Sequence, residues 1–112
     1  MGIRLFRFLG MISQKESIWL ALVGVIPLEG NDLTPNVSGA YVRVACKLAG
    51  DNLESHLREI FSDYHYSIFE IADIKLADAL NDEDLNNKVT QQLIAAINTG
   101  ATFAWGTFHT WK

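Results

Sequence analysis

The stretch Ala40-Tyr-Val-Arg-Val-Ala-Cys-Lys-Leu48 decides the fold class, because its side chains alternate between two sets. One set is apolar and consists of Val42, Val44, Cys46 and Leu48. The other set consists of Tyr41, Arg43, Ala45 and Lys47. A period of two residues is typical of a strand with one buried face. The stretch therefore predicts a β-strand whose outer face carries two cations and a tyrosine.

A second strand is predicted before this one. The run Ile18-Trp-Leu-Ala-Leu-Val-Gly-Val-Ile26 is apolar throughout and is followed by Pro27, which is typical of a strand covered on both faces. Residues 27–38, which connect the two strands, are rich in turn formers and predict a long exposed loop. Loops of that length often carry functional residues. The candidates in this loop are Glu29, Asn31, Asp32 and Asn36.

After Leu48 the spacing of apolar residues changes to that of amphipathic helices. The first helix follows an Asp51 and Glu54 pair that resembles a capping box, and its apolar stripe is Leu53, Leu57, Ile60, Phe61 and Tyr64. The second helix begins at the acidic run Asn81-Asp-Glu-Asp84 and ends before Gly100, and its stripe is Leu85, Val89, Leu93, Ala96 and Ile97. Residues 66–71 and 102–111 are predicted strands. Residues 73–80 are ambiguous between strand, loop and a short helical turn.

The element order is therefore β-β-α-β-α-β, which predicts an α+β fold. Two amphipathic helices need a sheet face to cover, so we expect a two-layer sandwich with both helices on one face of a mainly antiparallel sheet. A ferredoxin-like arrangement, or a close variant of it, best matches this order. Residues 18–112 would form a single α+β domain. Residues 1–17 are predicted to be a basic apolar leader or an extra edge strand.

The composition argues against several classes of protein. The 112 residues are 49% hydrophobic and carry a formal net charge of −4, which is atypical of disordered chains and of nucleic-acid-binding domains. The single cysteine, Cys46, excludes a disulfide framework. No apolar run approaches the ~20 residues that span a bilayer, and Arg7 interrupts the stretch that a secretory signal would need. We therefore expect a cytoplasmic protein with no membrane span and no nucleic-acid partner.

The residues that could carry metal or catalytic chemistry are scattered along the chain. The spacing of a metal site is not found among Cys46, His56, His65 and His109. The glycines do not form a phosphate-binding loop, and the serines lack the context of a catalytic nucleophile. We therefore expect no metal and no cofactor, and the pattern favours a protein that is not an enzyme.

The last predicted strand carries the strongest functional signal. Its alternation places one set of side chains on a common face, namely Phe103, Trp105, His109 and Trp111. If the helices cover the opposite face, these residues project from an open face that would also hold Tyr41, Arg43 and Lys47. Exposed aromatic patches usually mark contacts. Two other interpretations stay open: the rings fill the core, or they line a ligand cleft.

Two functional hypotheses follow from these patterns. In the first, the chain is a small non-catalytic protein-interaction module that forms a homodimer through the open sheet face. Its acidic composition would also suit an immunity or inhibitor-type protein that binds a basic partner, because complementary charge speeds association. In the second, the chain is a small enzyme or ligand-binding protein with a cleft around His109, whose imidazole would act as acid, base or anchor.

Overall fold

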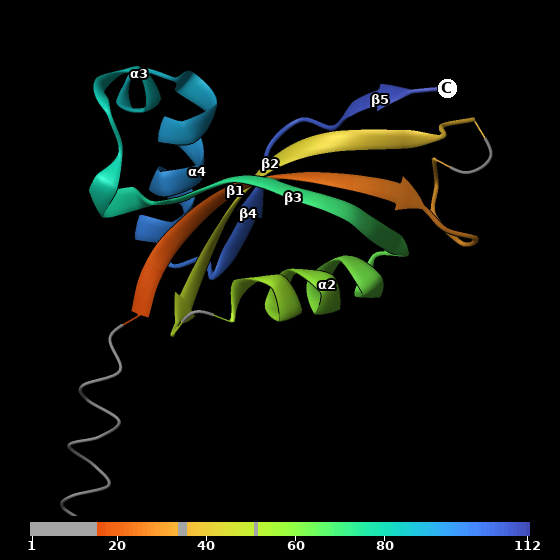
Figure 1. Ribbon diagram of the computed structural model, residues 1–112, viewed down its shortest axis with the longest axis horizontal. Helices are drawn as coiled ribbons and strands as arrows, with labels where there is room; N and C mark the ends of the chain where they lie inside the picture. Colours follow the sequence, from red (N-terminus) through yellow and green to blue (C-terminus); the bar gives the residue numbers. More distant parts are fainter. Residues whose placement is uncertain (1–15, 34–35, 51) are drawn as a thin grey trace, which may run out of the picture.

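A five-stranded antiparallel sheet organises the computed structural model, which describes residues 16–33, 36–50 and 52–112. Its strands are β1 (Glu16–Pro27), β2 (Gly39–Ala49), β3 (Tyr66–Leu76), β4 (Phe103–Trp105) and β5 (His109–Trp111). They lie in the order β3-β1-β2-β4, and β5 also pairs with β2 (Figure 1). All four pairings are antiparallel. The prediction of an α+β fold with a mainly antiparallel sheet is therefore confirmed.

Strand β1 lies at the centre of the sheet, between β2 and β3. Its consecutive residues Leu20 and Ala21 are both buried, although their side chains point to opposite faces. The prediction of a strand covered on both faces is therefore confirmed. Helix α2 (Leu53–Asp63) connects β2 to β3, and these two strands run parallel because both are antiparallel to β1. The three elements form a split βαβ unit.

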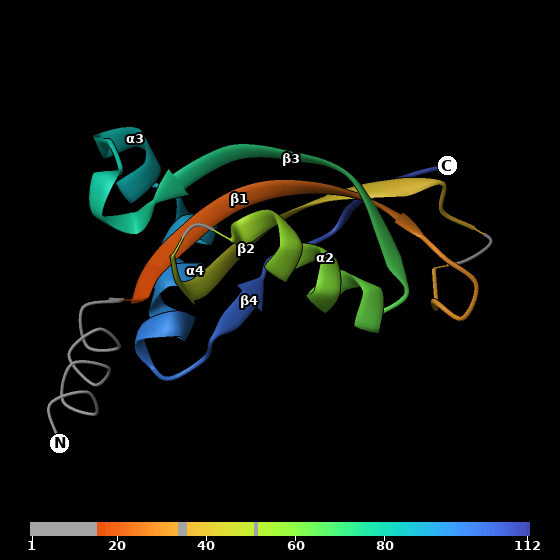
Figure 2. The ribbon, with the colours of Figure 1, turned by 60° about the horizontal axis from the view of Figure 1, so that its bottom comes forward.

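The two long helices cover opposite faces of the twisted sheet (Figure 2). Leu57 of α2 packs with Val44 in one buried cluster, whereas Leu93 of α4 (Lys88–Asn98) packs with Ala45 in another. Because Val44 and Ala45 are neighbours in β2, their side chains point in opposite directions. The prediction that both helices lie on one face is wrong, because β1 and β2 carry apolar residues on both sides and each side needs a cover. We name the two sides the α2 face and the α4 face.

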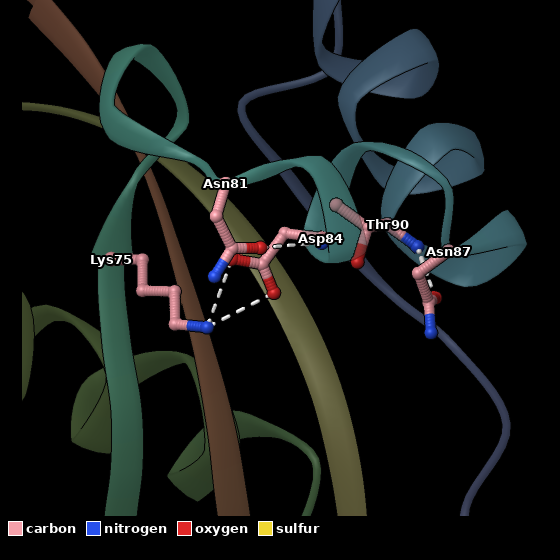
Figure 3. A network of polar contacts seen from close by, with 5 residues as sticks. All are labelled: Lys75, Asn81, Asp84, Asn87 and Thr90. Atoms are coloured by element: carbon pink, nitrogen blue, oxygen red, sulfur yellow. Dashed lines mark hydrogen bonds and ion pairs between the residues drawn. The ribbon is translucent and has the colours of Figure 1, made fainter.

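The predicted second helix is divided into α3 (Asp82–Leu85) and α4. Each piece begins with an asparagine cap: Asn81 Oδ1 accepts a hydrogen bond from the Asp84 amide at 2.8 Å, and Asn87 Oδ1 accepts one from the Thr90 amide at 3.0 Å (Figure 3). Lys75 Nζ lies 3.0 Å from both carboxylate oxygens of Asp84. The ambiguous stretch continues β3 to Leu76 and then forms the 3₁₀ turn η1 (Ala77–Ala79).

Parts of three expectations fall outside the described residues. Glu16 and Ser17 of the predicted leader belong to β1, whereas residues 1–15 lie outside the description. Residues 34–35 of the long loop and Asp51 of the predicted capping box lie outside it as well. Helix α2 begins after Asn52, whose side chain makes no capping hydrogen bond within the described part of the chain.

The last predicted strand is broken into β4 and β5 by one extra residue. Trp105 pairs with Val44 and His109 pairs with Tyr41, so three residues of the last strand span only two residues of β2. A shift of one residue turns every later side chain to the other face. Trp105 therefore packs on the α2 face, and His109 lies on the α4 face beside Tyr41. The prediction that Phe103, Trp105, His109 and Trp111 share one face is wrong for this reason.

Candidate functional site

Three aromatic side chains form an exposed cluster on the α4 face, at the end of the sheet that α4 leaves uncovered. Tyr41 lies 5.7 Å from Phe69 and 5.4 Å from Trp111, and the Phe69 and Trp111 rings lie 6.1 Å apart, measured between ring centroids. Phe69 is 45% exposed and Trp111 is 41% exposed. Ile26 on β1 points to the same face and is 43% exposed. We name Ile26, Tyr41, Phe69 and Trp111 the ring cluster.

Two glycines provide the space in which the rings of this cluster lie. A Cβ atom at Gly24 would lie 2.6 Å from Cζ of Phe69, and a Cβ atom at Gly39 would lie 2.3 Å from Cζ2 of Trp111. Both distances are far shorter than an ordinary van der Waals contact between two carbon atoms. The rings therefore cover bare backbone, and any larger residue at either glycine would displace them.

A bulge in β3 brings two adjacent side chains to the ring cluster. Ile68 pairs with Val25 and Glu70 pairs with Gly24, so Phe69 is an extra residue with no partner in β1. Such a bulge turns neighbouring side chains toward one face. The Tyr41 hydroxyl donates a 2.8 Å hydrogen bond to Oε1 of Glu70. This bond to a carboxylate, together with burial, raises the pKa of Tyr41 above its ordinary value.

The structure brings two other predicted site residues together on the α4 face. Arg43 and His109 line a hollow of about 330 Å³, with Asn87, Val89 and Thr107 as its other described walls. The hollow lies next to the ring cluster, since His109 pairs with Tyr41 across β5 and β2. Lys47 is exposed elsewhere on this face, beyond the Ala45 position that α4 covers.

A second aromatic surface lies on the α2 face, where the chain forms a groove of about 540 Å³. Its walls come from the β1–β2 loop, the end of α2, the start of β3 and the last two strands. The rings that line it are Tyr64, Tyr66, Trp105 and Phe108. Asp32 and Asp63 lie among the same lining residues. We name this feature the aromatic groove.

Hydrogen bonds from the Asn31 side chain and the Leu28 backbone hold the loop side of the aromatic groove against the end of α2. The Asn31 side chain donates to the carbonyl of Tyr64 at 3.0 Å, and the Leu28 amide donates to the carbonyl of His65 at 2.8 Å. The Leu33 amide donates to Oδ1 of Asn31 at 2.9 Å. Predicted loop residues Asn31 and Asp32 therefore reach a candidate site. Two others, Glu29 and Asn36, are exposed and line neither surface.

The floor of the aromatic groove is continuous with the core. Phe61 is fully buried, and its ring centroid lies 5.5 Å from that of Trp105 and 6.0 Å from that of Phe103. The sequence left open whether the rings fill the core or line a cleft. Phe103 and Trp105 both pack on the core, and Trp105 also lines the aromatic groove. Neither belongs to the ring cluster.

The sequence pattern does not indicate several residues of these surfaces. Phe69 reaches the ring cluster only through the bulge, which no spacing of apolar residues indicates. The helical spacing predicts Tyr64 in the buried stripe of its helix, but in the structure Tyr64 caps α2 and is 56% exposed. The sequence signal for Tyr64 is its position at the very end of the apolar stripe, directly before His65. In the structure His65 has a backbone φ of 63°, in the left-handed region, where the chain leaves the helix.

Metal binding and thiol chemistry find no support in the described part of the chain. No three histidine, cysteine or acidic side chains among residues 16–33, 36–50 and 52–112 gather as metal ligands would. Cys46 is fully buried, and burial raises the pKa of its thiol to about 11. The described helices are all too short or too polar to cross a bilayer.

Comparison with known proteins adds no relative. No protein-family model matches the chain, and neither a curated protein nor a solved structure matches it.

Proposed function

We propose that this protein is a small non-catalytic interaction module that forms a homodimer through the ring cluster. The observation that carries the proposal is the exposure of Phe69, Trp111 and Ile26 side by side on an open sheet face. Contiguous apolar surface of this kind is rare on monomers, and aromatic residues are enriched in interfaces. In a twofold pair, the same patch would serve both copies.

The charges around the ring cluster support self-association. Glu70 lies at the β3 side of the rings, hydrogen-bonded to Tyr41, and Arg43 lies on β2 at the start of α4. A twofold axis that passes through the rings parallel to the strands would bring the acidic side of one copy toward the basic side of the other. Opposite charges at the rim favour encounter and fix the register of a pair.

The β3 edge of the sheet is poorly suited to association, which favours the face over this edge. Edge strand β3 carries two register shifts in its pairing with β1, and Asp73 has a backbone φ of 51° at one of them. Bulges and charged residues prevent an edge strand from pairing with another chain. A dimer built on the face does not depend on hydrogen bonds from this edge.

The hollow beside His109 is better suited to binding than to catalysis. Its other described lining side chains are a guanidinium, an amide, an aliphatic chain and a hydroxyl, from Arg43, Asn87, Val89 and Thr107. None of these groups acts as a base at neutral pH, and none is a carboxylate that would orient the imidazole. The proposal therefore assigns no catalytic residue.

Sedimentation equilibrium of two matched variants tests the proposal. Phe69 and Ile74 are both exposed apolar residues of β3, but only Phe69 belongs to the ring cluster. Truncating an aromatic anchor typically costs about 2 kcal/mol of binding. Because Phe69→Ala removes the ring from both copies, it should raise the dimer dissociation constant at least about thirtyfold. Ile74→Ala should change it by no more than about twofold.

Circular dichroism spectra of both variants should match that of the wild type, because neither side chain belongs to the buried clusters. A wild-type chain that stays monomeric at millimolar concentration would contradict the proposal. Equal effects of the two substitutions on the dissociation constant would contradict it too.

A further inference from the structure

The walls of the aromatic groove are rings whose faces attract positive charge. The Tyr64 and Trp105 rings lie 5.0 Å apart at an interplanar angle of 65°, and Trp105 and Phe108 lie 5.0 Å apart at 81°. These steep angles set the Trp105 ring across the Tyr64 and Phe108 rings, whereas Tyr66 and Phe108 stack with their centroids 5.3 Å apart at an interplanar angle of 19°. The π face of an aromatic ring carries partial negative charge, and tryptophan attracts cations most strongly.

Two carboxylates add full negative charge to the same groove. Asp32 comes from the β1–β2 loop and Asp63 from the end of α2. His65 also lines the groove, whereas no lysine or arginine is among its described lining residues. The ion pairs found among the described residues involve neither aspartate. Asp63 also lies in the last turn of α2, where the negative end of the helix dipole disfavours a carboxylate. A bound cation would offset this unfavourable position.

We infer that the aromatic groove binds an organic cation that carries a quaternary ammonium group. Such a group spreads its charge over methyl groups and donates no hydrogen bonds, so it suits walls that are mostly aromatic. The volume of about 540 Å³ lies within the usual range of small-molecule sites. The hydrogen bonds from Asn31 and Leu28 to the α2–β3 turn hold the loop wall in place before a ligand arrives.

The aromatic groove is independent of the proposed dimer contact. Trp105 and Phe108 pack on the α2 face, whereas Tyr41 and Trp111 lie together on the α4 face. Binding of a cation in the groove therefore does not require the dimer, and its failure would leave the dimer proposal intact.

The experiment compares choline with 3,3-dimethylbutan-1-ol, which has the same shape but a carbon atom in place of the charged nitrogen. Each compound is titrated into the protein at pH 8 and low salt, and the indole N–H signal of Trp105 is followed by NMR. Choline should bind saturably, with a dissociation constant about tenfold or more below that of the alcohol.

Two substitutions assign the effect to the groove. Tyr64→Ala and Asp63→Asn should each weaken choline binding at least about threefold, whereas Tyr64→Phe keeps the ring and should retain the affinity. Asp78→Asn is the matched control, because Asp78 is an exposed carboxylate in η1, beyond the far end of β3. The affinity of the Asp78→Asn variant for choline should equal that of the wild type. Both substituted groove side chains are exposed, so folding should be preserved.

Three results would overturn the inference. The first is the absence of saturable choline binding. The second is equal affinity for choline and the neutral alcohol, which would show that the groove takes apolar groups regardless of charge. The third is an Asp63→Asn variant that binds choline as tightly as the wild type does.

Discussion

At the scale of single residues, the burial of the Cys46 side chain makes the stability of the fold depend on pH. It belongs to the cluster that α2 covers, together with Val42 and Val44, and it is fully buried. Burial disfavours the thiolate because the surrounding side chains cannot solvate a negative charge. The pKa of the thiol therefore rises from 9.0 to about 11. The folded chain keeps this proton at pH values where the unfolded chain has already lost it.

This difference makes the stability of the protein depend on alkaline pH. Below pH 9 both states hold the proton and the contribution is complete; as pH rises toward 11, only the unfolded state releases it, and stability is lost. Between pH 8 and pH 10.5 the wild type should lose about 2 kcal/mol more unfolding free energy than Cys46→Ala. Urea unfolding at both pH values measures the difference. Equal losses of unfolding free energy in the wild type and in Cys46→Ala would contradict a raised pKa of the buried thiol.

At the scale of elements, the break between α3 and α4 depends on asparagine caps. Asn87 accepts the Thr90 amide at 3.0 Å and so satisfies one of the free donors at the start of α4. Removing a cap of this type typically costs about 1 kcal/mol. Asn87→Ala should therefore lower the unfolding free energy by about that amount in urea. Asn98→Ala, at the exposed last residue of the same helix, should not lower it.

The elements themselves were largely predictable from the sequence, since each has a periodic apolar pattern. The alternation around Val44 and the helical stripe around Leu57 both match the observed elements. The faces were less predictable, because a single inserted residue reverses them. One such residue lies between Trp105 and His109, and another is Phe69. No local pattern marks either insertion, so the two aromatic surfaces could only be found in three dimensions.

The apolar pattern of β1 indicates that the sheet carries a helix on each face. A strand that is apolar on both faces needs cover on both, and the run around Leu20 and Ala21 is such a strand. The expected two-layer sandwich leaves one face of that strand without a helix. The observed arrangement places α2 on one face and α4 on the other, which agrees with the burial of both residues.

At the scale of the whole molecule, the uncovered part of the sheet defines what the protein can contact. Helix α4 packs over Ala45 and Leu20 at one end of its face, and the ring cluster occupies the other end. The aromatic groove lies on the opposite face, so the two surfaces can be occupied at the same time. A dimer through the ring cluster would leave two grooves open to solvent.

The central claim, that two copies meet through the ring cluster, is tested most directly by isotope-filtered NMR. Equal amounts of ¹³C,¹⁵N-labelled and unlabelled protein are mixed, so that only contacts between copies give filtered nuclear Overhauser effects. We expect such contacts among the side chains of Ile26, Tyr41, Phe69 and Trp111, because these lie together on the open face. Filtered spectra without any contact, or with contacts only at Tyr64 and Trp105, would contradict the claim.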